Sequence, residues 1–444
     1  MVVAWGKAAY EIYRAVSRAI APLLYLHLHW RRLRGLEHRS RWPERFGCPS
    51  APRPRGRLIW FHAVSLGEGL AAIPVIKSCL QENPNMLILM TTTTLSAFEV
   101  IQVRLPRSVI HQFAPLDTPM AIKNFLVYWD PFAVILMESE LWPNLIISAS
   151  EKGVKLALLN ARISYKSFRR WSMKISLPLI SLMLSKFSLI VPLSMVEAIR
   201  FQLLNAPPFI ISFSGDLKYA VGGIQLSERV NKNISDFKLQ LIDRPVWMAA
   251  SIHRGEEEVM VFVHKELTSE FPNLFSILVT RHPQHGRKLA QELQRRGLNV
   301  ALRSRSELIS PCMDIYIVDT LGDLGMLYKA TPIAVIGGSF LHDLAGHNFS
   351  EAAAAGCAVL TGPYIGHFSS MLAEMQRVDS LSILQVEGKV ELVRALKLLL
   401  SNSKLLAAHQ KAAKHAFSVV SKGVVRIAWD LINTNVCKAR SLNY

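Results

Sequence analysis

The stretch at residues 58–73, LIWFHAVSLGEGLAAI, predicts a strand, a tight turn and a helix in immediate succession. Its first part, 58–64, is an apolar and aromatic run of the kind that forms a buried strand. A polar turn containing two glycines follows, and apolar residues then recur at helical spacing from Leu70 onward. In an α/β sheet this succession places Glu68 at the carboxyl edge, where such sheets hold their ligands.

Glu68 has two interpretations. A carboxylate beside a ligand crevice can act as a general base, and the flanking Gly67 and Gly69 would let another molecule approach the backbone. A glutamate in the first turn of a helix also complements the helix dipole without any catalytic role. The local sequence alone favours the second interpretation.

Outward from this stretch, strand and helix patterns alternate along the chain. The apolar runs expected as strands are 58–64, 86–93, 133–138, 155–161, 189–194, 209–214, 246–251, 275–280, 300–304, 315–320, 333–339 and 358–363. Continuous apolar strands separated by helices predict parallel sheets that are covered on both faces. The expected fold class is therefore α/β, with two doubly wound units that face each other across a cleft.

The domain boundaries follow from changes in composition. We expect a first Rossmann-like domain at 58–220 and a second at 245–444, which ends in two amphipathic helices at about 385–434. The more polar segment between them, 221–244, is expected to be a linker.

The first 34 residues have an amphipathic pattern. Lys7, Glu11, Arg14 and Arg18 fall on one narrow helical stripe, and most of the remaining surface is apolar. The longest charge-free run is too short to cross a bilayer, so residues 1–34 are expected to form a membrane-associated interfacial helix. A helix packed on the globular body and an organelle targeting segment are the alternatives.

The Arg-rich and Pro-rich segment 35–57 is expected to be a basic linker, with a solvated charged face as the alternative.

The overall charge points to an anionic partner. The chain of 444 residues carries 51 Lys and Arg against 33 Asp and Glu, a formal net charge of +18. A phosphorylated substrate or an anionic membrane surface fits this balance. A nucleic-acid partner is not expected, because no zinc-finger or RNP-type pattern is present. The five cysteines are far apart and form no CxxC pair, so neither a disulfide framework nor a metal site is expected.

Three candidate binding segments follow expected strands of the second domain. They are Arg281 and His282, then Gly322, Asp323 and Leu324, and lastly Asn348, Phe349, Ser350 and Glu351. Arginine offers bidentate hydrogen bonds to a phosphate, and a helix start near Asn348 offers backbone N–H groups. Each residue also has a non-functional interpretation. Asn348 and Glu351 could form the N-terminal cap of a helix, and Arg281 could form a surface ion pair.

Other common nucleotide and hydrolase motifs are missing from the sequence. It contains no GxxxxGK[ST], no GxGxxG after a strand and no GxSxG, which argues against P-loop, dinucleotide and α/β-hydrolase chemistry.

In the first domain, Glu138 and Glu140 end an expected strand just before Trp142. Paired carboxylates beside an aromatic ring could hold sugar hydroxyls, or they could tie down the loop.

Several longer stretches together resemble the 3-deoxy-D-manno-octulosonic acid (Kdo) transferases of lipid A biosynthesis. They are RWPERFG (41–47), FHAVSLGEG (61–69), PLDTP (115–119), MESELWPN (137–144), LLNARIS (158–164), SGDLKYA (214–220), TRHPQH (280–285) and GGSF…GHNFSEAAAAG (337–356). Because they extend over most of the chain, the resemblance implies a GT-B fold and an inverting, metal-independent transfer of Kdo. No cofactor is implied; the donor would be CMP-Kdo and the acceptor a phosphorylated lipid A precursor.

The resemblance also implies roles for the candidate residues. Glu68 matches the general base of the family, and the segments at 281–282, 322–324 and 348–351 match its CMP-binding stretches. GHNFSEAAAAGCAV at 346–359 departs from the bacterial pattern, which indicates a plant-type member located in mitochondria; the cytoplasmic face of a bacterial inner membrane is the alternative. Two other functions stay open: an inactive membrane-associated GT-B binding protein, and a GT-B enzyme that uses a UDP-sugar.

Overall fold

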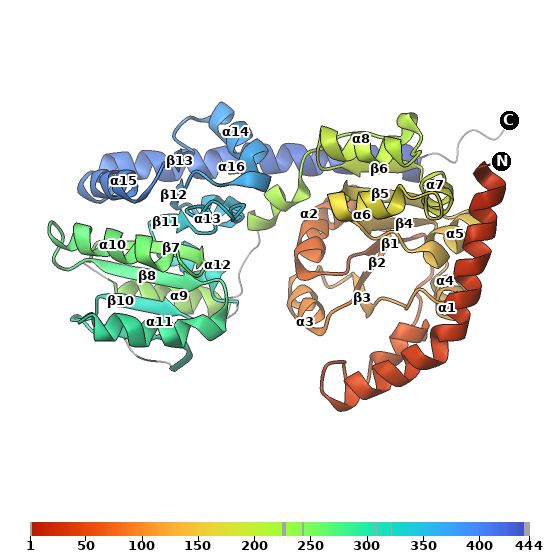
Figure 1. Cartoon of the computed structure of the whole chain (residues 1–444), viewed down its shortest axis with the longest axis horizontal. Helices are drawn as coiled ribbons and strands as arrows, with labels where there is room; N and C mark the ends of the chain where they lie inside the picture. The colour runs from red at the N-terminus through yellow and green to blue at the C-terminus, as the bar shows by residue number, and fades with distance from the viewer. Residues whose placement is uncertain are drawn as a thin grey trace. The chain divides into compact units, whose positions relative to one another are not determined.

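The computed structural model describes residues 2–223, 228–241, 244–305, 307, 309–320 and 322–438. The chain forms two compact units (Figure 1). The N-terminal unit comprises Met1–Lys218 together with Gly423–Tyr444, and the C-terminal unit comprises Tyr219–Lys422.

The N-terminal unit is built on a six-stranded parallel sheet in the order β3-β2-β1-β4-β5-β6. Its strands are β1 (Leu58–His62), β2 (Leu87–Thr92), β3 (Ile110–Phe113), β4 (Ala133–Met137), β5 (Lys155–Ala161) and β6 (Leu189–Pro192). Every residue of β1 and β4 is buried, as the continuous apolar runs predict. The order of the strands reverses between β1 and β4, so the ligand crevice of the doubly wound fold lies after these two strands.

Helices cover both faces of this sheet. They are α1 (Val2–Leu33), α2 (Leu66–Glu82), α3 (Leu95–Arg104), α4 (Pro119–Trp129), α5 (Pro143–Glu151), α6 (Tyr165–Trp171), α7 (Leu177–Leu184) and α8 (Met195–Leu203), with short 3-10 turns η1 (Trp42–Phe46) and η2 (Pro208–Ile210).

The C-terminal unit has a seven-stranded parallel sheet in the order β13-β12-β11-β7-β8-β10-β9. Its strands are β7 (Val246–Ile252), β8 (Phe275–Thr280), β9 (Val300–Leu302), β10 (Ile315–Val318), β11 (Ile333–Ile336), β12 (Ala358–Thr361) and β13 (Ile383–Gln385). Here the order reverses between β7 and β11. The predicted α/β class with two Rossmann-like parallel sheets is confirmed.

The helices of the C-terminal unit alternate with its strands. They are α9 (Glu228–Leu239), α10 (Glu257–Thr268), α11 (Pro283–Arg295), α12 (Leu324–Ala330), α13 (Ser350–Ala355), α14 (Ser369–Val378), α15 (Lys389–Ser401) and the first part of α16 (Ser403–Ile432), with the shorter turns η3 (Leu217–Gly223), η4 (Arg303–Arg305) and η5 (Gly366–Phe368). The end of α16 and the short π-helical turn η6 (Asn433–Cys437) belong to the N-terminal unit. The two closing helices expected at about 385–434 correspond to α15 and α16.

One predicted strand is wrong and two strands were missed. Residues 209–214 form no strand beyond a single bridge between Ile211 and Ile190, and the 3-10 turn η2 occupies their start. The preceding Pro207 and Pro208 lack the N–H groups that a strand ladder needs. The edge strands β3 (IHQF) and β13 (ILQ) were missed because polar residues interrupt their short apolar runs.

The expected linker and the expected second domain need correction. Within 221–244, residues 228–239 form helix α9, because Ile234, Phe237 and Leu241 recur at helical spacing and are buried in the C-terminal unit. Residues 224–227 and 242–243 lie outside the described residues. At the other end, residues from Gly423 onward belong to the N-terminal unit rather than to the second domain. The indole of Trp429 there donates a hydrogen bond of 2.7 Å to the Glu82 carboxylate.

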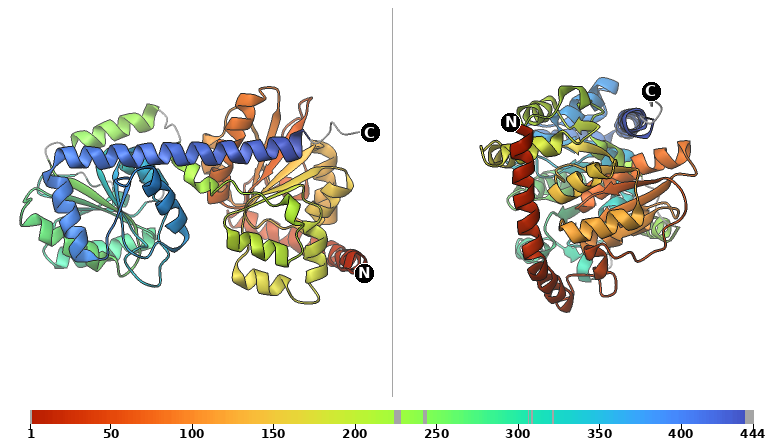
Figure 2. Two further views of the ribbon diagram at one scale, coloured as in Figure 1. Left: turned by 90° about the horizontal axis from the view of Figure 1, so that it is seen from above. Right: turned by 90° about the vertical axis from the view of Figure 1, so that its right-hand side faces the viewer.

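Helix α1 lies along one side of the N-terminal unit, against α4, α5 and α7 (Figure 2). It approaches α7 closely at Gly6, where a Cβ would lie 2.8 Å from the Pro178 carbonyl oxygen. The Tyr13 hydroxyl donates to the buried Asp117 carboxylate at 3.0 Å, and the Asn144 amide donates to the Ser17 hydroxyl at 3.0 Å. The PLDTP and ELWPN motifs therefore anchor α1 to the sheet.

The other face of α1 is exposed and apolar. Trp5, Ile12, Val16 and Leu23 recur at steps of seven or four residues, and each is at least 50% exposed. Among the described residues, no helix, α1 included, has the length and apolar character that a membrane crossing requires. The alternative of a helix packed on the globular body is confirmed for one face of α1. Membrane association of its exposed face stays a prediction.

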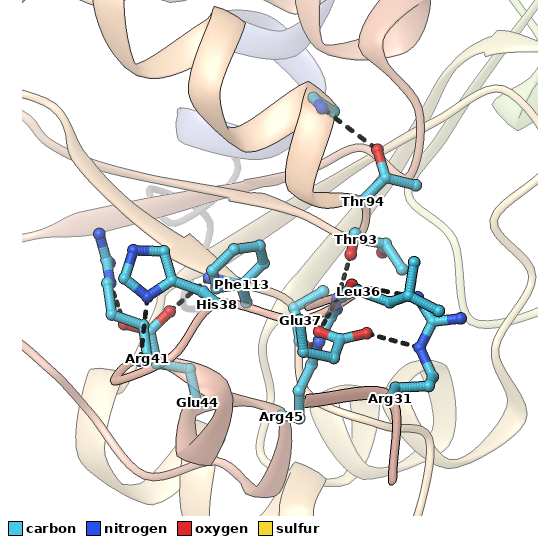
Figure 3. A network of polar contacts seen from close by, with 12 residues as sticks. Arg31, Leu36, Glu37, His38, Arg41, Glu44, Arg45, Thr93, Thr94 and Phe113 are labelled. Carbon is cyan, nitrogen blue, oxygen red and sulfur yellow. Dashed lines mark hydrogen bonds and ion pairs between the residues drawn. The ribbon is translucent and has the colours of Figure 1, made fainter. Parts of the chain in front are cut away.

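The segment 35–57 is not a solvated linker. Glu37, Glu44 and Arg45 are buried, and Arg45 lies 3.3 Å from Glu37 (Figure 3). The Glu44 carboxylate accepts a hydrogen bond of 2.6 Å from the Phe113 backbone N–H, and Arg41 donates to the His111 carbonyl at 2.6 Å. The RWPERFG motif thus supplies the edge of the sheet at β3 with polar partners, which explains why its charges are buried rather than solvated.

The two glycines beside Glu68 differ in their surroundings. A Cβ at Gly69 would lie 1.9 Å from Ile101 Cδ1 of α3, so this glycine permits close packing of two helices. A Cβ at Gly67 would meet nothing within 4 Å. The expectation that both glycines leave room for another molecule therefore holds for Gly67 only.

This difference predicts opposite effects of two matched substitutions. Gly69→Ala must displace buried Ile101 and should lower the free energy of unfolding by about 1–3 kcal/mol. Gly67→Ala should leave it unchanged or raise it by up to about 1 kcal/mol, since alanine favours the helix. Urea denaturation followed by circular dichroism measures both, and equal stability of the two variants would contradict this packing.

Candidate functional site

Glu68 lies at the start of α2, directly after the central strand β1. Its side chain folds back on the helix start: Oε2 accepts the Val64 N–H at 2.8 Å and Oε1 accepts the Ser65 hydroxyl at 2.8 Å. Ser65 is the N-cap, and its oxygen accepts the Glu68 N–H at 3.4 Å. This is a capping box, so the helix-start interpretation of Glu68 describes its contacts correctly.

The same contacts leave Glu68 suited to accept a proton. Each carboxylate oxygen can accept two hydrogen bonds, so each retains an acceptor position beyond its cap contact. The side chain is 8% exposed, and this burial raises the pKa of the Glu68 carboxyl above its ordinary value, against the lowering effect of the Val64 and Ser65 donors. A raised pKa makes a carboxylate a stronger base.

Glu138 follows β4, the strand adjacent to β1, and binds two cations. Its backbone adopts a left-handed conformation with φ of 54°, and its side chain is buried. Arg162 Nε lies 3.0 Å from Glu138 Oε2, and Lys218 Nζ contacts Oε1. The negative charge of Glu138 also contributes to the raised pKa of Glu68.

Asn160, at the end of β5, fixes the segment that carries Lys218. Asn160 also has a positive φ, at a break in the register between β5 and β6. Its amide donates to the Asp216 carboxylate at 2.6 Å and its oxygen accepts the Leu217 N–H at 3.0 Å. The LLNARIS and SGDLKYA motifs therefore serve one purpose, which is to hold Lys218 beside Glu138.

A pocket of about 310 Å³ opens beside these carboxylates. Its wall includes Tyr13 of α1, Glu140, Trp142 and Trp171 of α6. Burial raises the pKa of the Glu140 carboxyl to about 7. The Trp142 indole donates a hydrogen bond to this carboxyl at 2.5 Å, which lowers the pKa by a smaller amount. The nearby negative charges of Glu68 and Glu138 raise it further.

In the C-terminal unit, every candidate segment lies after a strand. Arg281 and His282 follow β8, Gly322 to Leu324 follow β10, and the stretch from Asn348 to Glu351 follows β11. Arg281 and His282 are exposed, and the Arg281 N–H is anchored by the Ile252 carbonyl at 2.9 Å. β8 and β10 are neighbours in the sheet, so the segments at 281–282 and 322–324 come from adjacent strand ends.

Asp323 is held in place by two partners. The Arg303 guanidinium donates to Asp323 Oδ1 at 3.2 Å, and the Thr320 hydroxyl donates to Oδ2. Gly322 has a φ of +95° and open space around it, and Leu324 begins helix α12.

The segment before α13 differs from the expected cap. The N-cap is Phe349 rather than Asn348, so Glu351 occupies the second helical position and forms no capping box. Asn348 instead accepts the Ser350 N–H at 2.9 Å. Phe349 and Ser350 are fully buried, and Phe349 packs on Phe368.

Two histidines that the sequence analysis did not single out complete this edge. His253 follows β7 and His347 follows β11, and their Nε2 atoms are 2.7 Å apart. The His253 ring also meets His282 edge-on, with centroids 6.0 Å apart. The structure thus brings Arg281 and His282 together with the segment at Asn348. The signal available in the sequence was the histidine in SIHRGEE, directly after an expected strand.

The described residues contain no group of three His, Cys, Asp or Glu side chains that could hold a metal ion.

Comparisons with known proteins give these observations a family. Residues 40–221 match the family described as 3-Deoxy-D-manno-octulosonic-acid transferase (kdotransferase). The chain is 56% identical over 440 residues to the "Probable 3-deoxy-D-manno-octulosonic acid transferase, mitochondrial" of Arabidopsis thaliana. The aligned region covers 99% of this chain and 98% of that protein. It is 31% identical to the 3-deoxy-D-manno-octulosonic acid transferase of Haemophilus influenzae, with 95% and 97% covered.

Solved structures resemble the chain in fold. The UDP-GlcNAc 2-epimerase of Neisseria meningitidis matches with a TM-score of 0.58 at 11% identity, over 86% of this chain and 100% of that one. A glycosyltransferase of Rickettsia africae matches with a TM-score of 0.56 at 13% identity, over 87% and 100%. These likenesses confirm the predicted GT-B fold class of two Rossmann-like domains. On the identity shared with its plant and bacterial relatives, the chain belongs to the 3-deoxy-D-manno-octulosonic acid transferase family.

Proposed function

We propose that this protein transfers Kdo from CMP-Kdo to a hydroxyl of a phosphorylated lipid A precursor, with inversion at the anomeric carbon and without a metal ion. Family membership supports the transferred sugar. The observation that carries the mechanism is the position of Glu68 after β1, where the strand order reverses toward β4, together with the burial that raises its pKa.

In the proposed reaction, Glu68 accepts the proton of the acceptor hydroxyl. The hydroxyl oxygen forms a bond to the anomeric carbon of Kdo, and the bond from that carbon to the phosphate oxygen of CMP breaks. The electron pair of the broken bond leaves with CMP. The Val64 N–H and the Ser65 hydroxyl hold the Glu68 carboxylate in one orientation, which favours proton transfer from an acceptor hydroxyl bound beside it.

The ion pairs of Glu138 supply positive charge near this base. Without them, Glu68, Glu138 and Glu140 would repel an anionic donor and an anionic acceptor. Arg162 and Lys218 offset that repulsion, so the carboxylate of Kdo or a phosphate of the acceptor meets cations at the same edge.

The cations of the C-terminal unit suit the CMP part of the donor. Arg281 provides bidentate hydrogen bonds for the phosphate, in the place that the resemblance to the family gives to CMP. Asp323, fixed by Arg303 and Thr320, offers an acceptor for a ribose or base donor group.

The pocket beside Glu140 suits the acceptor sugar. Aromatic rings of Tyr13, Trp142 and Trp171 present flat apolar faces, and the Glu140 carboxyl offers hydrogen bonds to hydroxyl groups. The negative charge of Glu68 is close enough to raise the pKa of Glu140, so a sugar in this pocket lies near the proposed base.

The exposed stripe of α1 suits a membrane surface. Its apolar residues can enter the boundary of the acyl chains, while Lys7 and Arg18 face anionic headgroups. The plant relative is a mitochondrial protein by name, and we propose a mitochondrial membrane surface for this chain as well.

Replacement of Glu68 by glutamine tests the proposed base. Glu68→Gln keeps the size and a cap acceptor but cannot take a proton, and should lower turnover of CMP-Kdo by about 10²–10⁴-fold. In the wild type the rate should rise with pH as Glu68 ionises, because the carboxylate is the active form. CMP release with purified lipid A precursor is the readout. Glu99→Gln, at an exposed position on α3, is the matched control; near-equal rates for both variants would remove Glu68 from this role.

Vesicle sedimentation tests the membrane surface. The triple variant Ile12→Ser, Val16→Ser and Leu23→Ser removes exposed apolar side chains without touching the packed face of α1, and should weaken binding to anionic phospholipid vesicles by about 10-fold or more. The control replaces Val103, Met120 and Val127, which are equally exposed on α3 and α4, by serine. Equal binding of the two triple variants would show that α1 is not the membrane contact.

A further inference from the structure

A pair of histidines occupies the point where the strand order of the C-terminal sheet reverses. His253 follows β7 and His347 follows β11, and these are the two strands on either side of the reversal. Their rings stack with centroids 4.9 Å apart and an interplanar angle of 12°, and the two Nε2 atoms are 2.7 Å apart. Ligands of doubly wound sheets bind at this position.

The surrounding residues fix the two loops that carry the pair. The fully buried Glu256 carboxylate accepts the backbone N–H of His253 at 2.8 Å and the backbone N–H of Gly338 at 2.7 Å, which ties the loop after β7 to the loop after β11. The His347 ring lies against Gly338, where a Cβ would come within 2.8 Å of it. A pair held this firmly is part of a built site rather than a chance contact on a mobile surface.

Two Nε2 atoms at this distance can bond only through one shared hydrogen. In the neutral pair, one ring donates from Nε2 and the other accepts. The pair can take one further proton, since the ring that accepts through Nε2 can become an imidazolium that donates to its partner. A second added proton would place two cations in contact.

We propose that the His253–His347 pair belongs to the phosphate-binding site for the nucleotide and takes up a proton when the phosphate binds. This inference rests on the proposed function and adds two residues to its donor site. The ligand class is a nucleoside monophosphate, free or esterified to a sugar.

The charges around the pair explain why uptake would wait for the ligand. From the loop after β8, Arg281 and His282 face both rings, and from the start of α10 the carboxylates of Glu256 and Glu257 face His253. Burial, followed by the positive charge of Arg281, lowers the pKa of His347 to about 4, and burial also lowers the pKa of His253. A phosphate beside Arg281 adds the missing negative charge, and an opposite charge within about 4–6 Å raises a histidine pKa by about 1–3 units.

The adjacent pocket has room for such an anion and the right charge. It measures about 280 Å³ and is lined by Ile252, Arg254, His282, Gln284, His285 and Lys288. None of these lining residues is acidic, so the wall offers an anion only neutral or positive side chains. A protonated pair beside it would also stabilise the charge that develops on the leaving phosphate.

Calorimetry with CMP as the probe tests this inference. The full chain is titrated with CMP at pH 7 in two buffers that differ in ionisation enthalpy, and the difference in heat gives the protons exchanged per CMP bound. CMP is then about nine-tenths dianion, because the second phosphate pKa is about 6. A rise of about 3 units would bring the pKa of His347 from about 4 to about 7, so we expect uptake approaching about 0.5 proton by the wild type at pH 7, and affinity that increases as the pH falls from 8 to 7.

Two variants separate the pair from other histidines. His253→Gln keeps a polar partner for His347 but cannot titrate, so it should bind CMP with uptake near zero. His415→Gln changes an exposed histidine on α16, outside this site, and it should retain the uptake of the wild type. CMP binding without proton uptake in the wild type, or equal uptake by His253→Gln, would overturn this inference and leave the transferase function intact. Failure of the wild type to bind CMP would overturn the proposed donor and this inference together.

Discussion

Three carboxylates, Glu68, Glu138 and Glu140, share one partly buried edge of the N-terminal sheet, and their mutual repulsion governs the structure around them. Ionised groups in such surroundings are costly unless each has a partner. Glu68 has the cap of α2, Glu138 has Arg162 and Lys218, and Glu140 has the Trp142 indole. The long motifs at 137–144, 158–164 and 214–220 supply these partners. They thereby hold the three carboxylates in place, and the pKa of Glu68 stays raised by burial.

The C-terminal unit uses the same edge of a parallel sheet for nitrogen-bearing side chains rather than for carboxylates. Its strand ends carry Arg281, His282, His253 and His347, and its buried carboxylate Glu256 binds backbone N–H groups rather than facing the pocket. One unit is thus suited to take a proton from an acceptor, and the other to bind and release an anion. This division follows from the fold, because parallel strands gather the residues after their carboxyl ends at one edge.

Much of this could be predicted from the sequence, and the failures have physical causes. The buried strands β1, β4 and β8 were found because each is a continuous apolar run. The segment 209–214 failed because two prolines before it remove ladder donors, and α9 was missed because polar residues mask three buried apolar positions. The candidate residues were placed after the correct strands, but Phe349 proved to be a core residue. The His253–His347 pair could not be predicted, since its partners are 94 positions apart and meet only when β7 and β11 are adjacent.

The most direct test of the transferase function is the identity of the donor. Purified protein would be incubated with a tetraacyl lipid A precursor and either CMP-Kdo or a UDP-sugar, with a chelator present, and the lipid product analysed by mass spectrometry. The account predicts a lipid that gains Kdo from CMP-Kdo, release of CMP, and no product from the UDP-sugar. Transfer from the UDP-sugar, or binding of CMP-Kdo without any lipid product, would contradict it.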